Sequence, residues 1–462
     1  MDYHRCFAGS LSMYGLVQPG IFRDLTSSRS AFLLSTRPGR NVTATRPQCG
    51  HVKATAAAPE LTDHIMLKQL SDLKTWEKFY EYKTSLACPK EFTKKLREFI
   101  DRRGFEQVCA KISRGEAFPH PRKSVISKLG SSKKRTVYIY PEEENIVLKL
   151  LTYLLLRKYD GLFDDGLYSF RPGRSAKDAI RSLLRNRGIS GMYSYKVDIH
   201  NYFNSVPVDR ILPMLDEVMA EEPETCAFLK RLLNDPLVLD RGNPVEEEKG
   251  IMAGTPLSSF YANLYLRSMD RYFAELGVPY ARYSDDIIVF APTREETEAY
   301  AAKIRAFLAD FGLTVNPDKE NFAAPEDGWT FLGFSVKDNV VDIAPATVLK
   351  LKGKMRRKAA GLLRWRIRND VRGEKAASAF IRIFNRKLLE GPKDNELTWS
   401  CWFFPVINTS ASLHVIDLYA QECVRYIISG KRTKSRFNVR YEDMKKLGYR
   451  SLVHEFYAHE AE

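Results

Sequence analysis

Closely spaced metal-binding residues are missing from this sequence. Its seven cysteines and eight histidines are scattered over 462 residues, and none of the cysteines forms a Cys-x-x-Cys pair. Zinc sites and disulfide frameworks both depend on regularly spaced ligands, so the pattern argues against both. Scattered free cysteines are typical of a reducing compartment, and we therefore expect a cytoplasmic protein.

The sequence also lacks an apolar run long enough to cross a bilayer, so we expect no membrane partner. Hydrophobic residues make up 44% of the chain, as in a globular protein. One sign of charge dominates, because 72 Lys and Arg residues stand against 57 Asp and Glu and give a net charge of +15. A surplus of this size indicates a polyanionic partner, for which nucleic acid is the first candidate.

Acidic residues are scarce at the start of the chain, where Asp2 and Asp24 are the only two before residue 60. The first convincing helical pattern begins at Met66. We expect residues 1–64 to be a poorly ordered segment or an extension, and the alternatives are a transit peptide and a small ordered cap. The total length allows about three domains.

Three carboxylates stand at the ends of predicted strands. Asp285 and Asp286 lie at the tip of a predicted β-hairpin, just before the apolar segment 287–290, and Asp198 lies near the end of another predicted strand. Adjacent carboxylates oppose each other's ionisation, although the pair taken alone could be a solvated turn. If neighbouring strands bring all three together, they form an oxygen cage suited to Mg²⁺. Two such ions can activate a hydroxyl group and stabilise a leaving pyrophosphate.

Six segments between Lys128 and Phe334 resemble the motifs of reverse transcriptases, in the family's order. Residues 283–286, Tyr-Ser-Asp-Asp, resemble the Tyr-x-Asp-Asp box, and the segment that starts at Asp198 resembles the first palm motif. The other four are a fingers motif at 168–180, a Gly-rich turn and helix at 250–266, and the last palm motifs at 312–319 and 329–334.

The resemblance implies an α/β fold of the right-hand polymerase type. Fingers and palm would combine an antiparallel sheet with helices, and an α-helical thumb would follow. We accordingly expect N-terminal helices and fingers at residues 65–189, the palm at 190–343, and a thumb or C-terminal nucleic-acid-binding domain at 344–462.

Two segments depart from the pattern of group II intron enzymes. Met252-Ala253-Gly254 stands where those enzymes usually carry Pro-Gln-Gly, and residues 133–140 replace their Arg-Pro-Leu-Gly-Ile-Pro. The resemblance is therefore closest to the stand-alone bacterial reverse transcriptases called unknown-group or defence-associated. It implies an RNA-directed DNA polymerase with an antiviral defence role. A group II intron-like maturase, template-independent or protein-primed DNA synthesis, and a non-catalytic RNA-binding scaffold stay open as alternatives.

The resemblance also implies roles for single residues. Asp198, Asp285 and Asp286 would be the catalytic carboxylates and, with the carbonyl group of Ile199, would hold two Mg²⁺ ions, with Mn²⁺ as an alternative. The aromatic ring of Phe203 would lie under the sugar and exclude a 2′-hydroxyl group. Residues implied at the incoming deoxynucleoside triphosphate are Lys134 and Arg135 (in a predicted basic loop), Phe203, Gly254 and Lys319.

A basic segment follows the expected palm, with nine Lys or Arg and no acid between Lys350 and Arg368. Such a run is often a solvated surface, but in this position it is typical of a thumb helix that grips a template–primer duplex. The expected partners are an RNA template, a DNA product, deoxynucleoside triphosphates and, as an option, a dedicated non-coding RNA. The sequence does not predict an oligomeric state. Predicted nucleic-acid contacts are Arg171 and Arg174, the first with a structural alternative, and Lys350, Lys354, Arg357 and Lys358.

Overall fold

The computed structural model describes residues 66–86, 88–127, 134–390 and 398–461. The expectation for residues 1–64 lies outside these ranges. No helix in the described ranges is both long and apolar enough to cross a bilayer.

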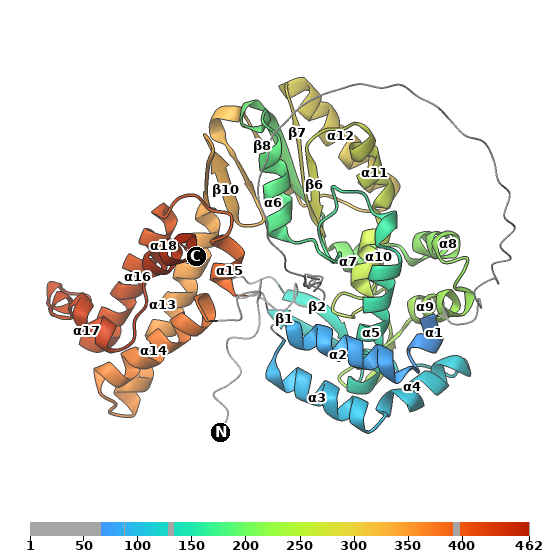
Figure 1. The fold of residues 1–462 in the computed structure, drawn as a ribbon, viewed down its shortest axis with the longest axis horizontal. Helices are drawn as coiled ribbons and strands as arrows, with labels where there is room; N and C mark the ends of the chain where they lie inside the picture. Colours follow the sequence, from blue (N-terminus) through green and yellow to red (C-terminus); the bar gives the residue numbers. More distant parts are fainter. Residues whose placement is uncertain (1–65, 87, 128–133, 391–397, 462) are drawn as a thin grey trace, which may run out of the picture.

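The described chain begins with helices that pack around one long helix (Figure 1). Their core includes Trp76, which is fully buried and stacks on Phe105 with ring centroids 5.2 Å apart. The long helix begins directly after Pro141, and its three glutamates lie in the first turn, where the helix dipole favours negative charge. The helices are α1 (Met66–Gln69), α2 (Leu73–Ser85), α3 (Lys90–Asp101), α4 (Gly104–Ser113) and α5 (Glu142–Lys158).

A small sheet of order β2-β1-β4-β5 lies beside these helices. Lys134 and Arg135 are strand residues in it, paired with Ser127 and Ile126 of the neighbouring strand. The prediction of a loop through Arg135 was therefore wrong, because antiparallel pairing extends the strand to Lys134. The strands are β1 (Arg122–Ser127), β2 (Lys134–Ile139), β4 (Leu237–Asp240) and β5 (Asn243–Glu246).

The central sheet has the order β6-β7-β3-β8, and its paired strands are antiparallel. Its strands are β3 (Tyr193–Asp198), β6 (Tyr280–Tyr283), β7 (Asp286–Ala291) and β8 (Asn321–Ala323). The predicted hairpin is confirmed, since β6 and β7 pair directly across a two-residue turn. Residues 287–291 of β7 are all buried, because both faces of this strand are covered.

Helices cover the two faces of the central sheet. Ala301 and Ile304 of α12 (Arg294–Asp310) belong to the same core as Val197, on one face of the sheet. Ile180 of α6 (Ala176–Arg185) belongs with Phe290 to the core on the other face. The helices of this region are α6 (Ala176–Arg185), α7 (Tyr202–Ser205), α8 (Val208–Val218), α9 (Pro223–Asn234), α10 (Ser258–Tyr265), α11 (Arg267–Glu275) and α12 (Arg294–Asp310).

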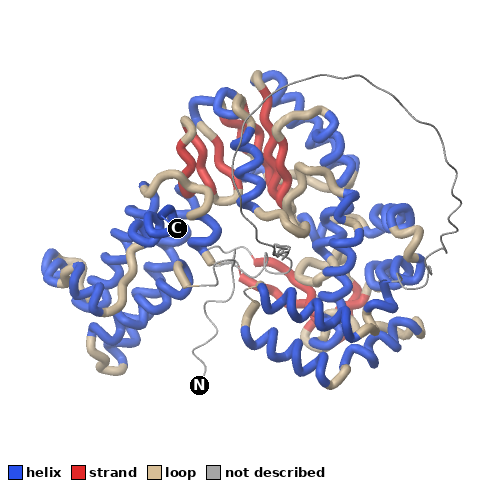
Figure 2. Tube along the Cα trace, in the orientation of Figure 1, coloured by secondary structure: helices blue, strands red, loops and turns tan. Residues whose placement is uncertain are grey.

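A three-stranded sheet leads from the central sheet into a part of the chain whose described residues are mainly helical, as Figure 2 shows. Its strands are β9 (Trp329–Phe331), β10 (Phe334–Lys337) and β11 (Val340–Ile343). The helices are α13 (Pro345–Arg368), α14 (Gly373–Leu388), α15 (Trp399–Phe403), α16 (Ala411–Ser429), α17 (Tyr441–Lys446) and α18 (Leu452–Ala461). The predicted fold class, α/β with an α-helical C-terminal part, is confirmed. The domain boundaries remain predictions.

Candidate active site

Two neighbouring strands bring the three predicted carboxylates to one end of the central sheet. Asp198 is the last residue of β3, and it lies directly opposite Asp286, the first residue of β7. Asp285 precedes Asp286 in the turn, and its backbone carbonyl accepts a hydrogen bond from the N–H of Ile199 at 3.0 Å. The long sequence separation between these segments is thus closed by strand pairing.

Burial and mutual repulsion perturb this cluster. Burial and the nearby Asp198 carboxylate raise the pKa of Asp285, although the positive charges of Arg135 and Lys319 act in the opposite direction. Burial, together with the charges of Asp285 and Asp198, raises the pKa of Asp286 to about 7. The site therefore carries more negative charge than its surroundings stabilise, and a bound cation would relieve the repulsion.

A short segment that follows helix α12 in the chain holds the side chain of Asp198. The Lys319 ammonium group, in the 3-10 helix η3 (Pro317–Lys319), forms an ion pair with one carboxylate oxygen of Asp198. Asn316 donates a side-chain hydrogen bond to the other oxygen at 3.3 Å, and its backbone N–H donates to the Asp198 carbonyl at 2.8 Å. Asp198 is buried, so these partners fix its carboxylate against the end of the strand.

The oxygen ligands at this end of the central sheet suit the coordination of Mg²⁺. In the described ranges, no three His, Cys, Asp or Glu side chains form a group that could hold a metal ion by themselves. Mg²⁺ rarely uses such a cage, because it usually binds one or two carboxylates and completes its shell with water and substrate phosphates. The carboxylates at this end of the sheet fit that mode of binding. The raised pKa values of Asp285 and Asp286 reflect a repulsion that a bound cation would relieve.

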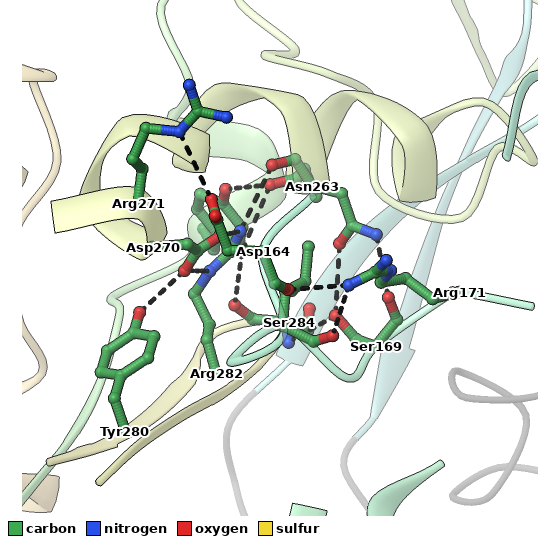
Figure 3. Close-up of polar contacts among 12 residues, drawn as sticks. Asp164, Ser169, Arg171, Asn263, Asp270, Arg271, Tyr280, Arg282 and Ser284 are labelled. Carbon is green, nitrogen blue, oxygen red and sulfur yellow. Dashed lines mark hydrogen bonds and ion pairs between the residues drawn. The ribbon is translucent and has the colours of Figure 1, made fainter. Parts of the chain in front are cut away.

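Polar side chains support the turn that carries Asp285, and Figure 3 shows three residues of this network, Ser284, Ser169 and Asn263. Ser284 has a φ angle of +61°, a backbone conformation that residues other than glycine adopt rarely. Its backbone N–H donates to the hydroxyl group of Ser169 at 2.9 Å. Asn263 of α10 in turn donates to the Ser169 carbonyl at 2.8 Å and accepts from the Ser169 hydroxyl at 3.2 Å.

A buried ion pair lies next to this support. Arg282 is fully buried, and its Nε donates to Asp270 of α11 at 2.7 Å. The hydroxyl group of Tyr280 donates to the same carboxylate at 2.8 Å. Two charges removed from water must pair with each other, so the ion pair ties strand β6 to α11 (Figure 3).

The residues predicted at the nucleotide come from four separate segments, one of which is η3 with Lys319. Lys134 is exposed on β2, and Arg135 beside it is close enough to lower the pKa of Asp285 through its charge. The ring of Phe203 is half-buried against Phe170, with centroids 6.4 Å apart. Gly254 has a φ of +97°, and a Cβ atom there would lie 3.2 Å from the carbonyl oxygen of Tyr138. The close neighbour of this glycine is thus another segment of the chain, and its predicted contact with the nucleotide stays a prediction.

The two predicted contacts in the fingers motif differ from each other. Arg171 is 3% exposed, and its donors are engaged by the carboxylate of Asp160 and by backbone carbonyls. These contacts favour the structural alternative for Arg171, and a nucleic-acid contact at this residue stays a prediction. Arg174 is partly exposed and pairs with Asp165, so its role stays a prediction.

The predicted thumb cations lie on α13. Burial and the charges of Arg357, Lys350 and Lys387 lower the pKa of Lys354, so these four cations are close neighbours. Spacings of three and four residues place Lys354, Arg357 and Lys358 on one side of the helix. Lys387 belongs to α14 and was not predicted. Its position relative to α13 cannot be read from sequence, because it depends on how the two helices pack.

A comparison with known families matches residues 126–336 to the model described as reverse transcriptase (RNA-dependent DNA polymerase). A curated relative is an uncharacterised 91 kDa protein in the cob intron of Schizosaccharomyces pombe, 23% identical over 47% of this chain and 34% of that protein. Another is the group II intron-encoded protein LtrA of Lactococcus lactis, 22% identical over 40% of this chain and 30% of that protein. The chain thus spans about a third of the length of these relatives.

Two telomerases are among the solved structures that match this chain. The apo telomerase of Candida tropicalis is 12% identical to this chain, with a TM-score of 0.42. The match covers 72% of this chain and 69% of the telomerase chain. The telomerase of Candida albicans in complex with a fragment of telomeric RNA is 13% identical, with a TM-score of 0.40. The match covers 77% of this chain and 71% of that telomerase chain.

Proposed function

We propose that this chain, which carries a reverse transcriptase domain at residues 126–336, is an RNA-directed DNA polymerase that extends a primer with deoxynucleotides. The observation that carries the proposal is the meeting of Asp198 with Asp285 and Asp286 at one end of the central sheet, inside the matched domain. Without a cation their repulsion would be a cost to folding, so the cluster is best explained by a metal-dependent reaction.

In the proposed reaction the primer 3′-oxygen attacks the α-phosphorus of a deoxynucleoside triphosphate, and pyrophosphate leaves. Asp198 and Asp285 would be the main ligands of Mg²⁺, or of Mn²⁺ in its place, with Asp286 and the Ile199 carbonyl in support. Two bound ions would supply positive charge to the attacking oxygen and to the leaving pyrophosphate. Lys319, which contacts Asp198, would pair with the leaving pyrophosphate, and its place beside this carboxylate supports that role.

The other chain residues bind and orient the substrates. Arg135 and Lys134 supply positive charge for the triphosphate, and the ring of Phe203 lies under the sugar. The helix α13 grips the RNA–DNA duplex through its phosphates, a contact that the net charge of +15 supports. The chemistry then depends mainly on positioning and charge, as in other phosphoryl transfers.

Two biological settings are consistent with this activity. The departures at residues 252–254 and 133–140 support a stand-alone bacterial enzyme with an antiviral defence role and a dedicated non-coding RNA. The second candidate is an intron-encoded maturase, favoured by the two curated relatives, which are both intron proteins. Sequencing the RNA that co-purifies with the protein separates them, since an intron enzyme would retain its host intron. Omitting the template from the assay tests template-independent synthesis.

The decisive variant is Asp285→Asn, which removes one negative charge and keeps the shape of the side chain. We expect it to abolish deoxynucleotide incorporation on a primed RNA template while the protein stays folded. Its matched control is Asp338→Asn, an exposed turn residue with a φ of +49° that asparagine adopts readily. Full incorporation by Asp285→Asn would overturn the proposed function.

A further inference from the structure

The side chain of Asn204 connects three of the four segments that carry the predicted nucleotide contacts. Its Nδ2 donates to the carbonyl oxygen of Thr136 on β2 at 3.2 Å. Its Oδ1 accepts from the backbone N–H of Ala253 in the Gly-rich turn at 2.9 Å. Asn204 itself lies in α7, directly after Phe203. One amide group thus uses both its donor and its acceptor to join β2, α7 and the turn.

Backbone contacts bring the same segments close together. The N–H of Ile251 donates to the carbonyl of Phe203 at 2.8 Å, and the N–H of Tyr138 donates to the carbonyl of Ala253 at 2.8 Å. Gly250 has a φ of +52°, and a Cβ atom there would lie 2.5 Å from the Phe203 carbonyl oxygen. The turn therefore packs tightly on both β2 and α7, and the Asn204 side chain adds the direct link between those two.

The link connects residues with different predicted tasks. Thr136 directly follows Arg135, whose charge acts on Asp285. Phe203 directly precedes Asn204, and its half-buried ring packs against the rings of Phe170 and Tyr202. A change in the Asn204 contacts would therefore shift the ring of Phe203 relative to Arg135 without removing either side chain.

We propose that Asn204 is a positioning residue for nucleotide selection, which sets the distance between the sugar-facing ring of Phe203 and the triphosphate-binding strand β2. The inference rests on the proposed polymerase function. It makes selection against a 2′-hydroxyl group depend on the amide of Asn204 as well as on the ring.

The test compares two variants. Asn204→Ala removes both contacts, whereas Asn204→Asp retains an acceptor for the Ala253 N–H and places an oxygen against the Thr136 carbonyl. The control is Ser205→Ala on the same helix, since within the described residues the Ser205 hydroxyl group makes only a long hydrogen bond, to the carbonyl of His200 at 3.4 Å. For each protein, kcat and KM are measured with a deoxynucleotide and with the matching ribonucleotide, together with the thermal unfolding temperature.

We expect Asn204→Ala to raise the deoxynucleotide KM and to lower the deoxy-to-ribo preference by about 3-fold to 10-fold, the effect of one or two hydrogen bonds, with a smaller change in kcat. Asn204→Asp should lower the preference as well, and it decides the test if the alanine variant does not fold. Because Asn204 acts through the ring, adding Asn204→Ala to Phe203→Ala should change the preference little further.

Parental preference in both folded Asn204 variants would overturn the inference, and so would fully additive effects with Phe203→Ala. These results leave the proposed function intact, because they require a parent protein that incorporates nucleotides. Asp285→Asn tests that function separately.

Discussion

The hydroxyl group of Ser169 accepts a hydrogen bond at 2.9 Å from the backbone N–H of Ser284, a residue 115 positions further along the chain. Ser284 holds a positive φ angle just before Asp285, so the turn needs outside support to keep that conformation. Ser169 supplies it from the loop before α6, and Asn263 holds Ser169 in place. A residue of the fingers motif thus contributes to the geometry of the carboxylate turn.

We predict that Ser169→Ala lowers kcat for deoxynucleotide incorporation by about 3-fold to 10-fold, because one buried N–H loses its partner. The nucleotide KM should change much less, since Ser169 is not among the predicted nucleotide contacts. Steady-state kinetics on a primed template measures both constants. Ser190→Ala, which removes an exposed hydroxyl group, is the control. An unchanged kcat for Ser169→Ala would mean that the turn keeps its shape without this bond.

The ion pair between Arg282 and Asp270 predicts a large effect on stability. Both side chains are at most 1% exposed, so removing one partner leaves a buried charge without compensation. Asp270→Asn or Arg282→Met should each lower the free energy of unfolding by about 3 to 5 kcal/mol. The double variant should lose less than the sum, because no isolated charge remains. Urea unfolding of all three variants tests this, and additive losses would contradict it.

Sequence reasoning located the carboxylates because their signal is local. The apolar run 287–290 and the strand that ends at Asp198 are β-patterns that can be recognised without a partner. The strand status of Lys134 was missed because it depends on pairing with Ser127. Arg171 was ambiguous because a motif fixes the residue type, whereas the direction of the side chain depends on Asp160.

The supporting residues could not be found from the sequence. Ser169, Asn204 and Asn263 act through hydrogen bonds to backbone groups that are 49 to 115 residues away. Such contacts leave no periodic pattern, because each depends on how distant segments pack. The one available signal was position, since Ser169 and Asn263 lie inside motifs that resemble those of the family and Asn204 directly follows another.

The cation cluster on α13 predicts a salt-dependent contact with nucleic acid. Replacing Lys354, Arg357 and Lys358 with Gln should weaken binding to an RNA–DNA hybrid by similar factors for unrelated sequences. With each phosphate contact that is lost, fewer counterions are released on binding. The slope of log affinity against log salt should therefore flatten by up to about three units. Hybrid affinity at several salt concentrations measures the slope.

The control for that experiment has the same change in charge at another place. Lys74, Lys78 and Lys94 are exposed on the N-terminal helices α2 and α3, and their replacement with Gln should leave the slope nearly unchanged. Equal slopes for both triple variants would assign the α13 cations to the solvated surface.

The backbone N–H of Met66 donates to both carboxylate oxygens of Glu222, at 3.2 and 3.0 Å. The Glu222 side chain is 1% exposed, and its other partners are Lys158 and Thr225. A buried carboxylate with two oxygens directed at one backbone nitrogen would bind an ammonium group at that nitrogen more strongly than an amide, because the hydrogen bond would be charge-assisted. A chain that begins at Met66 would place such an ammonium group there, so this contact gives a test of the expectation that residues 1–64 are an extension.

We predict that a C-terminally tagged chain beginning at Met66 unfolds at the same temperature as the 462-residue chain or at a higher one, and that it incorporates nucleotides at the parental rate. Any gain in stability should be largest at neutral pH and should disappear at alkaline pH, where the terminal amine loses its charge. Glu222→Gln should remove the gain, since a neutral amide attracts the ammonium group less. Thermal unfolding between pH 7 and pH 10 tests all of these effects in the two chain lengths. A lower unfolding temperature or a lost activity in the shorter chain would show that residues before Met66 contribute to the folded enzyme.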